Sequence, residues 1–338
     1  MAAFPSKEYP MIQKIYLYNG IGFDPHENLA IEKYLLDRVG PGECILYLWQ
    51  NQNTVVIGRN QNAWSECRTS LLEQERGILA RRLSGGGAVF HDLGNLNFTF
   101  LVRDEDYDVD RQLGVIQQAC RMAGIIAEKS GRNDLLADGR KFSGNAFYHQ
   151  GGHAYHHGTL MVDVDKDKLS RYLSPPKAKL EAKGVASVRS RVVNLKELSP
   201  ELSCHRMRRL MAQAFEEVYG LTAEEITLDQ AALQSVLETA ALYGSWDYLY
   251  GAPLSLSFQC EERFDWGHIQ LQMDAKSGVI TDVKAYSDSM DWLLTAAVEK
   301  SLAGCPFRLK DMAQAIRRGI ADKTVAEDLC SLLAKQDI

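Results

Sequence analysis

Runs of apolar residues with regular spacing divide the chain into strands and helices. Strict alternation and short apolar runs predict strands at 13–18, 44–50, 54–58, 78–82, 88–91, 95–102 and 153–164. Helical spacing predicts helices at 64–75, 108–124, 165–173 and 200–219. A further helix should begin at Asp24, which stands as a cap before Pro25 and three residues before Glu27. Asp138 and Gly139 lie between two short strand-like runs at 135–144, which indicates a tight hairpin.

The pattern changes after about Tyr248. A few strands between residues 253 and 288 are followed by apolar-periodic runs near 290–302, 308–319 and 324–335. A chain of 338 residues is also too long for one small core. We therefore expect two domains, 1–246 and 247–338, the second a small α+β unit. The aromatic-rich stretch 243–253 is the expected linker, packed against one of them.

Composition narrows the class of protein. Hydrophobic residues make up 46% and charged residues 24%, which is typical of a soluble protein. No window approaches the ~18 consecutive apolar residues of a membrane span, and the first ten residues lack a signal-peptide core. We therefore expect a cytoplasmic protein without a membrane partner. A formal charge of −6 argues against non-specific nucleic-acid binding.

The cysteines favour neither a disulfide framework nor a zinc site. Seven are scattered along the chain, and none stands in C-x-x-C spacing. They are expected to be reduced and mostly buried.

One segment is strongly basic in this acidic chain. The segment from Ser174 to Lys196 contains six Lys or Arg residues and one acidic residue, Glu181, so its formal charge is 6 − 1 = +5. Pro175 and Pro176 make the segment a loop. Charge alone leaves two interpretations, a solvated loop or a surface that meets an anionic ligand.

The stretch RRLSGGGAVFHDLGN, residues 81 to 95, carries the clearest chemistry. A run of glycines lets backbone N–H groups converge on an anion, and Arg81 and Arg82 are expected to add charge. The spacing matches neither the P-loop nor the dinucleotide fingerprint, and by itself it fits a hairpin turn equally well. Three more motifs that pair glycine with polar groups follow, at 131–134, 139–144 and 156–159.

These motifs together resemble one known family. RRLSGGGAVFHDLGN, SGRNDL, DGRKFSG, HHGTL and KGVASVRSRVVNL, in this order, resemble the lipoate-protein ligases, a group related to biotin ligases and octanoyltransferases. The resemblance covers roughly residues 12–245 and continues more weakly through ERFDWGHIQL and SDS. It implies an α+β fold: a large catalytic domain with mixed sheets and flanking helices, and a small C-terminal α+β domain.

The resemblance also implies a two-step reaction. Lipoate and ATP, with Mg²⁺, give lipoyl-AMP and pyrophosphate, and the lipoyl group then passes to a lysine of a lipoyl-domain acceptor protein. Acceptors of this type are 2-oxoacid dehydrogenase acyltransferase subunits and the glycine cleavage H protein.

Residue roles follow from the matching positions. Lys141 matches the lysine of the family's R-K-x-S-G motif and is expected to be catalytic, contacting both the α-phosphate and the lipoyl carbonyl. Expected ATP and lipoyl-AMP contacts are Arg82, Gly85, Gly86, Gly87, Ala88, Val89, Phe90, Asn95, Asn133, Asp134, Lys141, Thr159 and Lys183. Expected lipoate contacts are Arg82, Ser84, Gly87, Lys141 and His157.

The metal and loop assignments are less specific. Asp134 is a candidate Mg²⁺ ligand, although Asp134, Asn133 and Asn95 fit structural roles nearly as well. The reaction needs no transition metal, so no metal site is expected at the four histidines His149, His153, His156 and His157. Lys183, Arg189 and Arg191 fall where the family has its adenylate-binding loop, which implies closure over lipoyl-AMP.

Two alternatives to a ligase remain. One is an acyltransferase that works between carrier proteins through a cysteine thioester, although the chain has no cysteine between Cys120 and Cys204. The other is a transfer-only relative that uses preformed lipoyl-AMP. Whether lipoate or octanoate is preferred stays open, because Phe142 and Asn145 occupy variable positions of the hairpin, and Tyr148 and His149 follow it where some relatives carry a charged residue.

Overall fold

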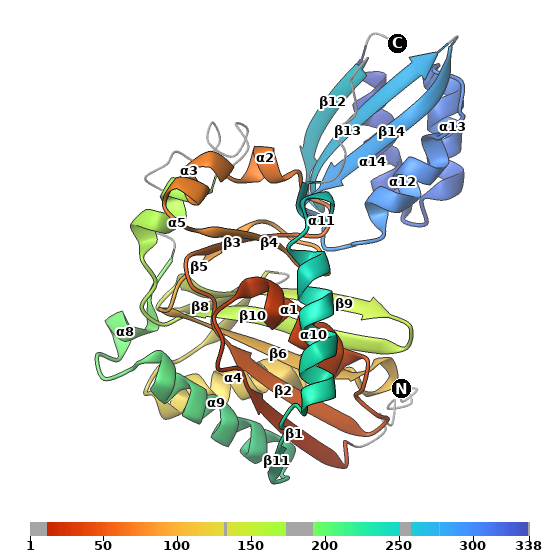
Figure 1. Cartoon of the computed structure of the whole chain (residues 1–338). Helices are drawn as coiled ribbons and strands as arrows, with labels where there is room; N and C mark the ends of the chain where they lie inside the picture. The colour runs from red at the N-terminus through yellow and green to blue at the C-terminus, as the bar shows by residue number, and fades with distance from the viewer. Residues whose placement is uncertain (1–11, 132–133, 174–191, 251–257, 277, 337–338) are drawn as a thin grey trace, which may run out of the picture.

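The computed structural model describes residues 12–131, 134–173, 192–250, 258–276 and 278–336. Three sheets and the helices that cover them form a large N-terminal unit and a smaller C-terminal unit (Figure 1). Within these described ranges, no helix is both long and apolar enough to span a membrane.

The strands of the large unit are β1 (Lys14–Asn19), β2 (Glu43–Trp49), β3 (Thr54–Ile57), β4 (Ile78–Arg81), β5 (Val89–His91), β6 (Asn95–Arg103), β7 (Glu128–Ser130), β8 (Asp134–Ala137), β9 (Arg140–Gln150), β10 (His153–Met161) and β11 (Ala223–Glu225). Its helices are α1 (Pro25–Leu36), α2 (Ala63–Glu66), α3 (Thr69–Gln74), the 3₁₀ turn η1 (Asp104–Asp106), α4 (Val109–Met122), α5 (Lys166–Tyr172), α8 (Leu195–Leu198), α9 (Cys204–Tyr219), α10 (Gln230–Tyr243) and α11 (Trp246–Tyr250). The small unit contains β12 (Phe258–Phe264), β13 (Gly267–Lys276), β14 (Val279–Ser287), α12 (Leu294–Leu302), α13 (Leu309–Gly319) and α14 (Lys323–Ala334).

A mixed sheet in the order β11-β1-β2-β6-β10-β9-β8-β7 forms the centre of the large unit. The pairs β11–β1 and β1–β2 are parallel, whereas β2–β6, β6–β10, β10–β9, β9–β8 and β8–β7 are antiparallel. The mixed sheets and flanking helices confirm the α+β fold expected from the sequence.

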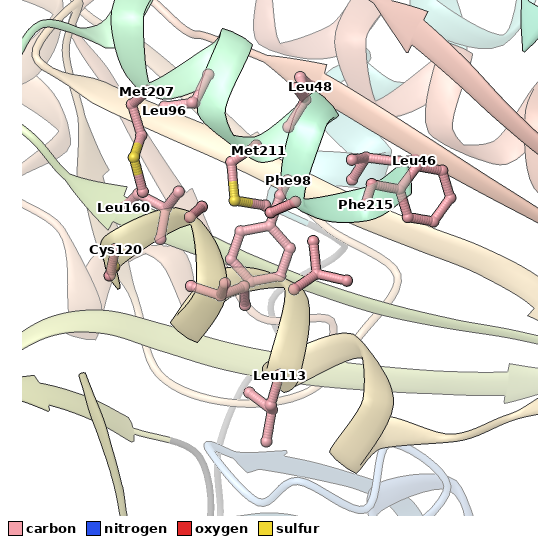
Figure 2. Close-up of a cluster of buried hydrophobic side chains, with 14 of the residues drawn as sticks. Leu46, Leu48, Leu96, Phe98, Leu113, Cys120, Leu160, Met207, Met211 and Phe215 are labelled. Atoms are coloured by element: carbon pink, nitrogen blue, oxygen red, sulfur yellow. The ribbon is translucent and has the colours of Figure 1, made fainter. Parts of the chain in front are cut away.

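Helices α4 and α9 cover one face of this sheet. Leu113 and Cys120 of α4 and Met207, Met211 and Phe215 of α9 are buried against apolar side chains of β2, β6 and β10 (Figure 2). Burying such side chains contributes about 1.5–3 kcal/mol each. This face therefore forms an apolar core of the large unit.

The opposite face carries the functional part of the fold. Helix α1 packs there beside α10, and the second sheet, in the order β4-β3-β5, lies over the central sheet. Asp24 caps α1 as predicted, because its carboxylate accepts the N–H groups of His26 and Glu27 at 2.8 and 3.1 Å.

Several sequence predictions need correction. The helix predicted at 64–75 is two short helices, α2 and α3, and the helix predicted from residue 200 begins at Cys204, after the cap Ser203. Strands β7 and β11 and helix α10 were not predicted. The expected linker 243–253 includes helix α11, whose Leu249 is buried among residues of the large unit. A domain division after residue 246 would therefore separate α11 from the core on which it packs.

The small unit has a core of its own. Its antiparallel sheet β12-β13-β14 packs on α12, α13 and α14 through a cluster made only of residues between Cys260 and Leu333. The predicted strands followed by helices are confirmed.

Candidate active site

A cavity of about 1040 Å³ lies between the central sheet, the β4-β3-β5 sheet and the small unit. Its N-terminal lining is Leu29, Trp49, Val56, Arg82, Gly86, Gly87, Ala88, Val89, His91, Asn97, Asp134, Lys141, Gly144, Asn145, Ala146, His157, Gly158 and Thr159. Its C-terminal lining is Arg263, Phe264, Asp265, Trp266, Gly267, Asp288, Met290 and Asp328. The small unit thus forms one wall of the cavity.

A hairpin and a β-bulge position Lys141. Asp138 and Gly139 have φ angles of 51° and 68° and close a two-residue turn, as predicted. Leu135 pairs with Ser143 but Leu136 pairs with Lys141, so β9 carries one extra residue at this point. Regular alternation back from Gly144 would turn Lys141 to the helix-covered face. The bulge instead places Lys141 on the cavity side.

Two neighbours hold Lys141 in place. Its Nζ lies 2.7 Å from Asp134 Oδ1 on the paired strand β8. Its backbone pairs with Val192, and its carbonyl accepts the N–H of Val193 at 2.9 Å. Val192 belongs to the basic segment 174–196, of which residues 174–191 lie outside the described ranges. Lys141 thus combines a fixed backbone with an ammonium group that faces the cavity.

Arg82 organises the glycine loop between β4 and β5. Its Nη2 donates to the carbonyls of Gly85 and Gly87 at 2.7 and 2.8 Å, and its Nε donates to Ser84 Oγ at 3.1 Å. Its Nη1 donates to Val56 O at 3.2 Å. Burial lowers the pKa of Arg82 to about 10, so the side chain stays charged at neutral pH. Most of its N–H groups therefore shape the loop.

Arg81 also donates hydrogen bonds to backbone carbonyls. Its guanidinium donates to the carbonyls of Gly58, Arg59 and Gln61, and to those of Tyr248 and Leu249 in α11. Both arginines were expected to add charge beside the glycine loop, but the Arg81 guanidinium is bound to these backbone carbonyls. Through these hydrogen bonds the Arg81 side chain links α11 to the turn after β3.

The small unit meets the glycine loop directly. The Gly86 N–H donates to the carbonyl of Ser289 at 3.1 Å, and a Cβ on Gly85 would lie 2.3 Å from the same oxygen. Asn60 Nδ2 donates to Trp292 O at 2.8 Å, and the guanidinium of Arg59 lies 4.6 Å from the centre of the Trp292 ring. Only a residue without a side chain at position 85 allows this approach.

A buried chain of polar groups runs beneath the cavity. Ser84 Oγ lies 2.8 Å from His157 Nε2, and His157 Nδ1 lies 2.8 Å from Glu32 Oε1. The Thr99 hydroxyl donates to the same Glu32 oxygen at 2.7 Å, and Trp49 Nε1 donates to Thr99 at 3.1 Å. Each polar group in the chain has a partner, so the chain holds the rings of Trp49 and His157 in place.

The structure brings most of the expected residues together. Those that line the cavity are Arg82, Gly86, Gly87, Ala88, Val89, Asp134, Lys141, His157 and Thr159. Those that support the lining from behind are Ser84, Gly85 and Asn95, of which Asn95 donates to Asn97 Oδ1 at 2.7 Å. Phe90 lies outside the lining, because its ring packs on Tyr172 in the core. Asn133, Lys183, Arg189 and Arg191 lie outside the described residues.

Two family models match the chain. Residues 24–216 match the lipoyl protein ligase A/B catalytic domain, and residues 254–333 match the bacterial lipoate protein ligase C-terminus. A lipoate-protein ligase A of Bdellovibrio bacteriovorus is 40% identical over 304 residues, which cover 88% of this chain and 90% of that protein. The chain belongs to the lipoate-protein ligase family.

Solved structures agree with this membership. P. falciparum LipL1 in complex with lipoate is 26% identical, with a TM-score of 0.83 over 95% of this chain and 100% of that one. The bipartite lipoate protein ligase of Thermoplasma acidophilum, studied with its E2 lipoyl domain, is 25% identical, with a TM-score of 0.64 over 74% of this chain and 100% of that one.

The cavity or supporting residues that were missed from the sequence include Glu32, Trp49, His91 and Asn97. A signal exists for Glu32, because it lies between Leu29 and Leu36 on the buried side of α1, where an acid needs a partner. The others are single residues in apolar strands, and their role depends on strand order.

We expect His91 and His156 to make the fold acid-sensitive. Burial, foremost, lowers the pKa of each to about 3, below the ordinary value of 6.5. Their contribution to stability is therefore complete above about pH 6.5 and is lost as pH falls toward 3. Between about pH 6 and pH 4 each should add a slope of about 1.4 kcal/mol per pH unit to the unfolding free energy.

Urea unfolding of the wild type and of His156→Phe across this range measures the contribution. The variant should show a slope smaller by about 1.4 kcal/mol per pH unit. An unchanged slope would mean that His156 takes up its proton equally in the folded and unfolded states.

Proposed function

We propose that the chain is an ATP-dependent lipoate-protein ligase. In the first step a carboxylate oxygen of lipoate attacks the α-phosphorus of ATP, and pyrophosphate leaves. In the second step the ε-amine of an acceptor lysine attacks the carbonyl of lipoyl-AMP, AMP leaves and the amine loses a proton. The observation that carries the proposal is that Lys141 and the glycine loop line the same cavity.

Lys141 would stabilise the charge that develops in both steps. Adenylation brings a carboxylate against a polyphosphate, and a fixed ammonium group between them lowers their repulsion without reorganising. Gly144 next to Lys141 helps this placement, since a Cβ there would lie 3.1 Å from the Lys141 Nζ. Asp134 keeps the ammonium group oriented toward the cavity before substrates bind.

The residues present fit an Mg²⁺ ion. Asp134 offers one carboxylate in the cavity wall, and Mg²⁺ typically takes one or two carboxylates together with phosphate oxygens. Asp134 would hold the ion, which when bound would neutralise phosphate charge. Among the described residues no cluster of three or more His, Cys, Asp or Glu forms a metal cage of its own.

The apolar part of the cavity fits the acyl chain of lipoate. Leu29, Val56, Ala146 and Trp49 contribute apolar side chains to its lining. A pocket with an apolar body and a few fixed polar groups is the usual form of a small-molecule site.

The cysteines argue against a thioester transferase. No cysteine is among the described residues that line the cavity, and all seven cysteines of the chain are described. Burial raises the pKa of Cys67 and of Cys120 to about 12, which keeps both thiols protonated and poorly nucleophilic.

A lipoyl domain is the acceptor we propose. The Thermoplasma acidophilum relative is described with its E2 lipoyl domain, which supports an acceptor of this class. Acyltransferase subunits of 2-oxoacid dehydrogenases and the glycine cleavage H protein are the proposed examples.

Pyrophosphate release tests the proposal. The full chain mixed with lipoate, ATP and Mg²⁺ should release pyrophosphate, and an added lipoyl domain should gain the mass of one lipoyl group. Transfer from supplied lipoyl-AMP without pyrophosphate release from ATP would instead identify a transfer-only enzyme. Transfer from an acylated carrier protein without ATP would identify a transferase.

We propose that the C-terminal unit serves adenylation. Its removal would open the wall formed by Arg263, Trp266 and Asp288, where carboxylate and polyphosphate must be held away from water. A chain ending at Tyr250 keeps the core clusters of the large unit. It should transfer lipoate from supplied lipoyl-AMP but fail with lipoate and ATP.

Measuring both half-reactions with the soluble truncated protein tests whether the C-terminal unit serves adenylation. Full activity with lipoate and ATP would contradict the adenylation role. A folded protein that is inactive even with lipoyl-AMP would show that the C-terminal unit also serves transfer.

A further inference from the structure

The cavity follows one row of residues across five strands of the central sheet. Trp49 on β2 pairs with Asn97 on β6, and Asn97 pairs with Thr159 on β10. The Gly144 N–H on β9 donates to Thr159 Oγ1 at 3.2 Å, and Gly144 pairs with Asp134 on β8. Adjacent strands are about 4.8 Å apart, so Trp49 lies about 14 Å from Gly144.

This row gives the cavity two chemically different ends. Lys141 lies over Gly144 at one end, where the proposed function places the carboxyl group. The far end is formed by Trp49, Asn97 and His91, whose ring centroid lies 6.2 Å from that of Trp49. An acyl chain extended from Lys141 would direct its last atoms toward this end.

Asn97 presents an N–H donor there. The residue is 1% exposed, and its Oδ1 accepts from Asn95 at 2.7 Å. Its Nδ2 has no hydrogen-bond partner among the described residues. Leaving a buried donor unpaired is unfavourable, so its presence in a cavity wall calls for an acceptor.

His91 presents a second donor. Asn51 Oδ1 accepts from Asn28 Nδ2 at 3.0 Å, so the Asn51 amide faces His91 with its Nδ2 and donates to His91 Nδ1 at 3.2 Å. The hydrogen of the neutral ring is therefore on Nε2. His91 is 3% exposed, and its Nε2 likewise has no partner in the described part of the chain.

Trp49, which lines the same end of the cavity, does not accept a hydrogen bond from either donor. The indole N–H of Trp49 is itself a donor and is used by Thr99 at 3.1 Å. Trp49, Asn97 and His91 all belong to the cavity lining, and the N–H groups of Asn97 and His91, unpaired among the described residues, are buried in this wall. Such an end suits a group that is apolar and polarisable but carries weak acceptors.

We propose that Asn97 and His91 select an acyl group whose far end carries hydrogen-bond acceptors, the two sulfurs of the lipoate dithiolane ring, over a plain alkyl chain. Thioether-type sulfur is a weak acceptor, and sulfur also packs favourably against aromatic rings. An alkyl chain such as octanoate would leave both donors without an acceptor. A site built to hydrogen-bond its substrate discriminates against an analogue that lacks the partner.

The inference rests on the proposed ligase activity, so the experiment measures that activity first. Pyrophosphate release by the wild type is compared for lipoate, octanoate and cyclopentylpentanoate, which keeps the five-membered ring but replaces both sulfurs with carbon. We expect kcat/KM for lipoate to exceed that for the cyclopentyl analogue by about tenfold or more. No release with any acid would contradict the proposed function itself, whereas equal values for lipoate and the analogue would overturn only the selection by sulfur.

Two variants locate the discrimination. Asn97→Leu and His91→Phe keep the approximate shape of each side chain and remove its donor. Each should lower the ratio of kcat/KM for lipoate to that for the cyclopentyl analogue about threefold, because each donor supplies about half of the selection in free-energy terms, and the ratio cancels general damage to the enzyme. A ratio that stays at the wild-type value in both variants would remove Asn97 and His91 from the selection.

Direct binding supplies a check that needs no variant. Calorimetric titration of the wild-type chain should show tighter binding of lipoate than of the cyclopentyl analogue, by about tenfold. Equal affinities, with an ordered water bridging the two donors in a crystal structure, would contradict the proposal.

Discussion

Lys141→Ala is expected to lower the rate of lipoyl transfer about 100-fold or more while leaving the fold intact. The side chain is partly exposed to the cavity and its removal opens no gap in the core, but it deletes the cation that we propose stabilises both reacting groups. Losing one preorganised charge of this kind commonly costs about 10²–10³ in kcat. The measurement is lipoyl-domain modification from lipoate and ATP, together with the melting temperature.

Lys129→Ala is the matched control. Lys129 also pairs with an aspartate at the edge of the same sheet, with its Nζ 3.0 Å from Asp110, but it lies outside the cavity lining. This control should keep wild-type activity. A Lys141→Ala protein that retains more than about a tenth of the wild-type kcat would contradict the catalytic role.

Arg82→Ala is expected to lower pyrophosphate release from lipoate and ATP about 100-fold. Its effect on transfer from supplied lipoyl-AMP should be smaller. Arg82 holds the carbonyls of Gly85 and Gly87, so its loss frees the loop whose N–H groups are proposed to meet the nucleotide. Equal losses in the two half-reactions would assign Arg82 to the general stability of the domain.

Arg82→Lys separates charge from shape. Lysine keeps the positive charge but lacks the planar fork that reaches several carbonyls at once. The structure therefore predicts that lysine restores little of the activity. Recovery to near the wild-type rate would mean that charge at this position matters more than the shape of the loop.

The glycine loop illustrates how far local sequence leads. Three glycines before a short strand correctly indicated a place where the backbone meets something closely. Residues 81 to 95 do not show what that contact is, because Gly85 and Gly86 meet Ser289, more than 200 positions later in the chain. The arginines were expected to act as charges, whereas the fold surrounds them with carbonyl groups.

The far end of the cavity was not predictable in the same way. Asn97 stands in the run NLNFTFLVR, where alternation indicates only that it faces away from Phe98. Its relation to Trp49 and Thr159 follows from the order β2-β6-β10, which joins segments about 50 and 60 residues apart. No local pattern records which strands become neighbours.

The hairpin that carries Lys141 separates the two levels most clearly. Alternating apolar residues, the Asp24 cap and the Asp138-Gly139 turn were determined by the sequence alone, since each depends on contacts within a few positions. Which face Lys141 occupies depends on a bulge against β8, and what it faces depends on a sheet order and a second unit far along the chain. Local backbone preferences act over one turn or one strand pair, whereas a site is assembled by burial and register across many, so only the tertiary structure could place it.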